Sequence, residues 1–194
     1  MTVNIRSLQN LPPHRRLDAY KRSKAAVKNE GAGVPKGWAG WLQFMFPTTF
    51  RGGFADHHAH FWEWTDSIEA NKRPAQPAYA MFFSRGGGKT TSAETSVVKV
   101  GAERRRNFCL YVRATQAKAN ESVKNISAKL EGALMSKHYP SAASRKEGKY
   151  GRSLGWNMTT LRCDNGYNVL ALGLDAAARG VKIEDYRPDY IVFD

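Results

Sequence analysis

The sequence predicts an α/β fold, a three-layer sandwich with a mostly parallel central sheet and a helical N-terminal extension. Three apolar runs, at residues 79–83, 108–112 and 190–193, have the length and composition of strands buried on both faces. Two segments with helical spacing, 92–101 and 116–138, alternate with these runs along the chain. Strands that alternate with helices are typical of parallel sheets covered by helices.

The composition is that of a folded domain with an anionic partner. The 194 residues suit one α/β domain, which buries roughly 70% of the surface of its unfolded chain. Lys and Arg number 30 against 17 Asp and Glu, so the formal net charge is +13. Such an excess favours polyanions, of which nucleic acid and anionic membranes are the common ones. Loss of an acidic remainder from a longer chain would explain part of the same excess.

Two features exclude other classes of protein. The only cysteines, Cys109 and Cys163, are too few for a disulfide framework, which favours a reducing compartment. No apolar run approaches the roughly 20 residues of a membrane-spanning helix, and the N-terminus lacks the apolar centre of a secretion signal. The sequence therefore predicts an intracellular protein with no membrane partner.

The chain divides into a basic and aromatic extension, residues 1–53, and a main domain, residues 54–194. Residues 14–30 predict a basic helix that ends before Gly31, and its composition fits a binding face and a merely solvated face equally well. Residues 31–50 hold tightly spaced aromatic side chains, which we expect to pack on the core of the main domain.

A helix is predicted over residues 54–70, where apolar side chains recur at helical spacing. It contains His57, His58 and His60, and neutral imidazole is a good zinc ligand. On a helix, however, the three rings would point to different sides, and no second cluster of His or Cys has matching spacing. We therefore expect no metal site here.

A β-hairpin is predicted in the last third of the chain. Residues 158–163 and 167–172 flank Asn165-Gly166, a pair that readily adopts the positive φ angles of a tight turn. The polar and basic segment 141–155, which precedes the hairpin, predicts a loop.

The segment with the clearest chemistry is Ser84-Arg85-Gly86-Gly87-Gly88-Lys89-Thr90-Thr91, called the glycine loop below. It follows the predicted strand 79–83 and precedes the predicted helix 92–101, which is the context of a phosphate-binding P-loop. Glycines let backbone N–H groups approach phosphate oxygens, and the helix directs its positive dipole end at the same anion. Lys89 would reach the β- and γ-phosphates of ATP, and the hydroxyl of Thr90 would coordinate Mg²⁺.

One residue departs from the standard P-loop pattern, because Phe83 stands where that pattern has its first Gly. A flexible turn with a chance Lys-Thr pair would explain the departure. The strand before the loop and the helix after it weigh against chance, as does Asp194, which ends the apolar run 190–193. A carboxylate at the end of a buried strand is what a Walker B segment supplies to the Mg²⁺ shell.

From about residue 54 to Asp194, the sequence resembles the ATPase domain of the large subunit of viral terminases, the DNA-packaging enzymes of tailed bacteriophages. In that family the loop often lacks its first Gly and carries an Arg, as with Phe83 and Arg85 here. The segments that carry the resemblance are, in chain order, Ser84-Arg85-Gly86-Gly87-Gly88-Lys89-Thr90, Leu110-Tyr111-Val112-Arg113-Ala114-Thr115-Gln116-Ala117, Ala178-Arg179-Gly180 and Arg187-Pro188-Asp189-Tyr190-Ile191-Val192-Phe193-Asp194.

The resemblance implies a P-loop NTPase of the RecA/ASCE type that couples ATP hydrolysis to the packaging of double-stranded DNA. Lys89, Thr90 and Asp194 would hold MgATP, with Thr90 and Asp194 as the Mg²⁺ ligands. Arg85 would contact the γ-phosphate from within the same subunit. Arg179 would either complete the site of a neighbouring subunit as an arginine finger or make a salt bridge or a DNA phosphate contact.

The implied partners are double-stranded DNA, a portal protein, the small terminase subunit and further copies of the chain in a ring, all in the host cytoplasm. Family members also carry a C-terminal nuclease domain, which this sequence lacks. We therefore expect a chain truncated at its Walker B strand, with weak or absent ATP hydrolysis.

Two other functions fit the same residues. A helicase or other nucleic-acid translocase has a similar P-loop core, and unwinding of a free duplex would favour it. A basic DNA-binding or assembly module with an inactive nucleotide site is the second alternative. Salt-sensitive DNA binding that ignores both ATP and Lys89→Ala would favour that module.

Overall fold

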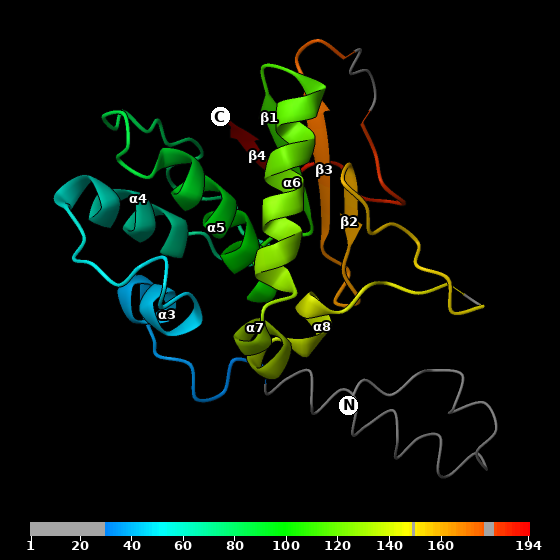
Figure 1. Ribbon diagram of the computed structural model, residues 1–194, viewed down its shortest axis with the longest axis horizontal. Coiled ribbons are helices and arrows are strands. Elements are labelled where there is room, and N and C mark those ends of the chain that lie inside the picture. Colours follow the sequence, from blue (N-terminus) through cyan, green and yellow to red (C-terminus); the bar gives the residue numbers. More distant parts are fainter. Residues whose placement is uncertain (1–29, 149, 177–180) are drawn as a thin grey trace.

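The computed structural model describes residues 30–148, 150–176 and 181–194, and within them the chain forms a four-stranded sheet with helices packed against it (Figure 1). The strands are β1 (Phe108–Arg113), β2 (Thr160–Arg162), β3 (Asn168–Gly173) and β4 (Tyr190–Phe193), in the order β2-β3-β1-β4. β1 pairs parallel with both β3 and β4, and β2 pairs antiparallel with β3. The predicted α/β fold with a mostly parallel sheet is confirmed.

The hairpin prediction is also confirmed. β2 and β3 pair from Thr160↔Leu170 to Arg162↔Asn168, and the turn between them contains Gly166 at a φ of 90°. The loop predicted before the hairpin has more structure than expected. Its first residues belong to the short helix α8 (Pro140–Ala143), and Arg145 forms an isolated bridge with Cys163.

Two helices lie side by side against one face of the sheet, α5 (Lys89–Ala102) and α6 (Gln116–Leu130) (Figure 1). The single helix predicted over residues 116–138 is wrong, because the structure divides it into α6 and α7 (Ala133–His138). The break falls at Gly132, which has an extended ψ of 148° and, as a glycine, the weakest helix propensity after proline. No helix within the described ranges is long and apolar enough to cross a bilayer.

Aromatic side chains from the N-terminal region complete the core, as predicted. They lie on α3 (Trp38–Met45) and α4 (Asp56–Asp66), where Trp41 and Trp62 are fully buried in the same cluster as the sheet residues. The basic helix predicted at residues 14–30 lies outside the described residues except for its last position, Glu30.

The strand predicted at residues 79–83 is wrong. The segment is irregular, and Tyr79, Met81 and Phe83 pack against the core while Phe82 is 92% exposed. A strand needs hydrogen-bonding neighbours, and none of the strands in the described part of the chain pairs with this segment. Packed and exposed side chains alternate along the segment as they do in a strand, but its backbone is not paired with any strand of the described sheet.

The two faces of β4 differ in environment. Tyr190 and Val192 face the core, and the hydroxyl of Tyr190 is 2.9 Å from that of Ser96 on α5. Ile191 and Phe193 point to the opposite face and are 51% and 72% exposed. β4 thus packs on α5 through the face that carries Tyr190 and Val192. This packing brings the C-terminal end of β4 to the N-terminal end of α5.

Candidate functional site

The glycine loop joins the irregular segment 79–83 to helix α5. Gly86 and Gly88 have φ angles of 81° and 76°, in the left-handed region that favours glycine, and Gly88 is the residue before the helix. The loop is closed by the N–H of Gly87, which donates to the carbonyl of Ser84 over 3.0 Å. No side chain caps the N-terminus of α5, so its first backbone N–H groups are available to an anion.

Lys89 is the first residue of α5, and its side chain folds back over the loop. Its Nζ donates to the carbonyl of Phe83 over 2.8 Å and more weakly to that of Ser84 over 3.4 Å. An ammonium group has three N–H donors, so at least one remains for a phosphate oxygen. The ammonium is therefore held at the rim of the glycine loop, as its predicted role requires.

The structure brings Thr90 and Asp194 together, although 104 positions separate them in the sequence. The hydroxyl of Thr90 donates to Oδ1 of Asp194 over 3.0 Å. Thr90 lies in the first turn of α5, and Asp194 directly follows β4, whose partner β1 places it at the carboxyl edge of the sheet. In open α/β sheets, ligands bind at this edge.

This pair of oxygens fits a magnesium ion. Mg²⁺ takes oxygen ligands in octahedral geometry, and two neighbouring ligands of such an ion lie about 2.9 Å apart. Thr90 Oγ1 and Asp194 Oδ1 lie 3.0 Å apart because they share a hydrogen bond, and this separation is also compatible with two ligands of one Mg²⁺ ion. Protein sites for Mg²⁺ commonly supply only one or two such ligands and leave the rest to phosphates and water.

Two neighbours of Asp194 were not predicted as site residues. The hydroxyl of Tyr111 donates to Oδ2 of Asp194 over 3.3 Å, and a guanidinium nitrogen of Arg113 lies 3.3 Å from the same oxygen. Burial, together with the charges of Asp194 and Glu94, raises the pKa of Tyr111, so it acts as a protonated donor. Both residues lie on β1, which pairs parallel with β4, so the predicted parallel sheet held a signal: parallel strands end at the same edge.

Arg113 is held between the site and helix α6. Besides its ion pair with Asp194, it donates to the hydroxyl of Ser122 over 3.1 Å, and its buried Nε makes no hydrogen bond with any described residue. Its side chain is 21% exposed and that of Asp194 only 12%. A cation therefore already neutralises the carboxylate at the place where Mg²⁺ would bind.

The remaining predicted site residues take different positions. Ser84 and Arg85 are exposed, and Arg85 makes no hydrogen bond or ion pair with the part of the chain that the structure describes. Thr91 lies in the first turn of α5, where its carbonyl accepts from Thr95. Arg179 lies outside the described residues.

Phe83 causes no strain at the position where the P-loop pattern has Gly. Its φ angle is not positive, so its backbone conformation does not call for glycine. Its ring packs in edge-to-face contact with His57 and His58 of α4, at centroid distances of 4.5 Å and 5.3 Å. The departure from the pattern therefore supplies a packing contact between the glycine loop and α4.

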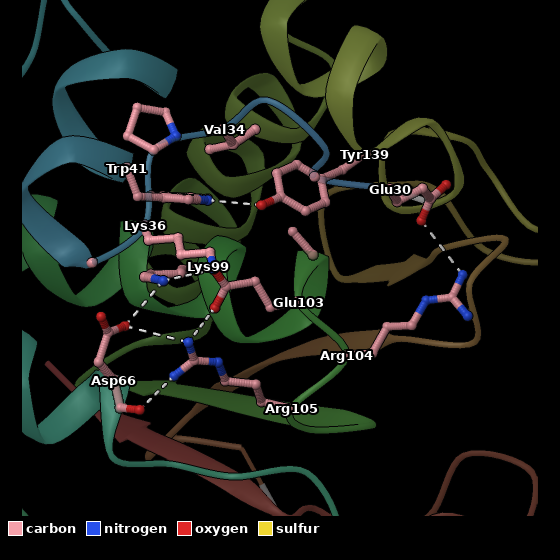
Figure 2. Close-up of a pocket in the computed structure, with 14 residues that line it drawn as sticks. Glu30, Val34, Lys36, Trp41, Asp66, Lys99, Glu103, Arg104, Arg105 and Tyr139 are labelled. Atoms are coloured by element: carbon pink, nitrogen blue, oxygen red, sulfur yellow. Dashed lines mark hydrogen bonds and ion pairs between the residues drawn. The ribbon is translucent and has the colours of Figure 1, made fainter. Parts of the chain in front are cut away.

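A cavity of about 920 Å³ lies near the C-terminal end of α5, and Figure 2 shows the charged side chains of its wall. Lys99 is 2% exposed and pairs with Asp66 at 3.0 Å and Glu103 at 2.7 Å, and Arg105 pairs with the same two carboxylates. Arg105 also donates to the carbonyl of Asp66 over 2.8 Å, which closes the C-terminal end of α4. The two cations and two carboxylates neutralise one another, and about 15 Å of helix separates Lys99 from Lys89. We therefore place the functional site at the glycine loop.

No protein-family model, curated protein or solved structure matches the chain.

Proposed function

We propose that the chain is the ATP-binding motor domain of a viral terminase large subunit, which couples ATP hydrolysis to the packaging of double-stranded DNA. The observation that carries the proposal is the contact between Thr90 and Asp194 beside the glycine loop. A P-loop threonine and a carboxylate after a parallel strand are the pair that holds Mg²⁺ in P-loop NTPases.

The same proposal assigns the finer fold, the three-layer sandwich of the RecA/ASCE type. Adjacent parallel strands β1 and β4, with the glycine loop at their carboxyl edge, support it. The exposed face of β4, which carries Ile191 and Phe193, is where a further layer would lie.

The phosphates of ATP would lie on the glycine loop. The backbone N–H groups of Gly86 and of residues 88–91 would bind their oxygens, assisted by the positive end of the α5 dipole, while that of Gly87 keeps its bond to Ser84. Lys89 would extend its free N–H donors to the β- and γ-phosphates while it keeps its bond to the carbonyl of Phe83. Arg85 is exposed at the same loop, where it is able to contact the γ-phosphate.

Thr90 and Asp194 would hold the metal ion through the two oxygens that already lie 3.0 Å apart. When bound, Mg²⁺ would neutralise the charge that develops during phosphoryl transfer. Arg113, which pairs with Asp194 at 3.3 Å, would compete with the ion for that carboxylate. Tyr111 keeps the carboxylate in place by its hydrogen bond.

The packaging role rests on the resemblance of the motifs and on the net charge of +13. Residues 1–29 contain seven Lys and Arg against one Asp, so this region is rich in groups suited to DNA phosphates. The proposed partners are double-stranded DNA, a portal protein, the small terminase subunit and copies of the chain in a ring, in which Arg179 acts on a neighbouring site. The host cytoplasm is the proposed location.

The proposal is tested by titration of the folded chain with a fluorescent ATP analogue and Mg²⁺. Lys89→Ala removes a charge-assisted hydrogen bond to the phosphates, worth about 1.5–3 kcal/mol, so binding should weaken roughly 10- to 150-fold. Thr90→Ala should weaken binding only when Mg²⁺ is present. Lys124→Ala, which removes an exposed lysine from the middle of α6, is the matched control and should bind like the wild type.

Absence of saturable binding, or equal binding by the Lys89→Ala and Lys124→Ala proteins, would refute the nucleotide site. DNA binding that is sensitive to salt but indifferent to both ATP and Lys89→Ala would then favour the DNA-binding module. Unwinding of a free duplex would favour a helicase.

A further inference from the structure

His58 connects helix α4 to the glycine loop. It is the third residue of α4, and its ring is partly buried. On one side, the backbone N–H of Ala55 donates to its Nδ1 over 3.2 Å. On the other side, its Nε2 lies 3.0 Å from the carbonyl oxygen of Gly87. The ring therefore makes one contact with the start of its own helix and one with the loop, 29 positions away.

These two contacts select one form of the imidazole. Nδ1 accepts a hydrogen bond from Ala55, so it carries a lone pair and no proton. The carbonyl of Gly87 is only an acceptor, so Nε2 must carry the proton and donate. The neutral Nε2–H tautomer satisfies both neighbours at once, whereas the other tautomer or the imidazolium ion would face the Ala55 N–H with a second donor.

The bond to Gly87 fixes the orientation of one peptide group in the loop. A trans peptide is planar, with its C=O and the following N–H pointing in opposite directions. Because His58 holds the carbonyl of Gly87, the N–H of Gly88 points away from the imidazole. Gly87 and Gly88, which this peptide joins, both lack side chains, and Gly88 has a positive φ angle, so little in the loop itself prevents this peptide from turning over.

The surroundings of His58 limit its movement. Its ring contacts that of His57 at a centroid distance of 4.1 Å and that of Phe83 at 5.3 Å. α4 itself is anchored in the core by Trp62. The side chain that donates to Gly87 therefore belongs to a helix packed in the core, and the neighbouring rings limit its movement.

We propose that His58 is a positioning residue of the nucleotide site, which holds the carbonyl of Gly87 so that the N–H of Gly88 is presented to a phosphate oxygen. This inference rests on the proposed nucleotide site at the glycine loop. His58 acts through the loop and does not touch the nucleotide.

Two neutral substitutions separate this role from capping of α4. In His58→Gln, the side-chain amide carries its acceptor oxygen and its donor NH₂ on one carbon, just as Nδ1 and Nε2 of the imidazole share one carbon. Gln is therefore able to keep both contacts, with the N–H of Ala55 and with the carbonyl of Gly87. In His58→Asn, the shorter amide still reaches the Ala55 N–H but not Gly87. The Asn variant should bind the fluorescent ATP analogue with Mg²⁺ about two- to twelvefold more weakly, the loss expected for one neutral hydrogen bond. The Gln variant should bind within twofold of the wild type.

The tautomer is measured separately, on the full chain without nucleotide. Long-range ¹H–¹⁵N correlation spectra of the imidazole should show His58 as the neutral Nε2–H form, and the Nδ1–H form would overturn the inference. Equal binding by the Asn variant and the wild type, while Lys89→Ala still weakens binding, would overturn the role of His58 alone. Absence of any Lys89-sensitive binding would overturn the nucleotide site, and the role of His58 with it.

Discussion

Helix α5 approaches the β2–β3 hairpin so closely that one added methyl group should destabilise the protein. Gly101 lies in the last turn of α5, directly over the ring of Tyr167. A Cβ built on Gly101 would lie 2.8 Å from Cγ of that ring and closer to two other ring carbons. Carbon atoms in contact prefer about 3.5–4.0 Å, so the helix or the ring would have to move by about an ångström.

The ring has little freedom to move. Tyr167 is 2% exposed, and its hydroxyl donates to the carbonyl of Val97 over 3.0 Å. Overpacking of this kind costs about 1–3 kcal/mol. Loss of the hydroxyl bond costs about 1 kcal/mol, and the better helix propensity of Ala returns about 1 kcal/mol. We therefore expect Gly101→Ala to lower the free energy of unfolding by about 1–3 kcal/mol, although the same change in an exposed helix would be stabilising.

The measurement is urea unfolding followed by tryptophan fluorescence and circular dichroism, with linear extrapolation to water. Gly52→Ala is the control, because its Cβ would enter open space and its φ angle is not positive. In a Tyr167→Leu background, Gly101→Ala should cost almost nothing, since the smaller side chain leaves room. A Gly101→Ala protein as stable as the wild type would refute the close approach of α5 to Tyr167.

Three further predictions follow from buried polar groups. Arg113→Gln removes the cation beside the carboxylate of Asp194, so millimolar Mg²⁺ should raise the melting temperature more in this variant than in the wild type, and equal shifts would contradict the proposed competition between Arg113 and Mg²⁺. Burial raises the pKa of Cys163 to about 12 and that of Cys109 further, so both thiols stay protonated at neutral pH. Mass spectrometry after alkylation at pH 8 should find neither cysteine modified in the folded chain and both modified in urea. Glu94 is 3% exposed and pairs with Lys129 of α6 at 2.7 Å, so Glu94→Ala leaves a partly buried lysine without its partner and should cost about 1–3 kcal/mol in urea unfolding, against almost nothing for the exposed Glu121→Ala.

Local patterns in the sequence were sufficient to predict several elements. The apolar runs at β1 and β4 are short, β-branched or aromatic, and bounded by polar residues, so their composition alone favours strands. Asn165-Gly166 predicts the turn of the hairpin because the positive φ of Gly166 is a property of the residue itself. The glycine loop was recognised for a similar reason, since three glycines before Lys89 and Thr90 let backbone N–H groups approach phosphate oxygens closely.

Other features were not decided by local composition. The run at residues 79–83 has the composition of a strand, but it lacks a pairing neighbour within the described residues. The helix pattern over 116–138 continues past Gly132, but the backbone turns there so that α7 packs as a separate helix. In both cases, the outcome depends on what lies beside the segment in space.

The sequence by itself determined the residue types of the candidate site: glycines, Lys89, Thr90 and a carboxylate at Asp194. Only the tertiary structure decided that Thr90 meets Asp194, that Arg113 neutralises it, and that His58 holds the loop. Propensity and spacing act over a few residues, whereas these contacts join residues that are 29 to 104 positions apart. Such contacts follow from the order and register of the strands and from the packing of α4 and α5, which no local pattern specifies.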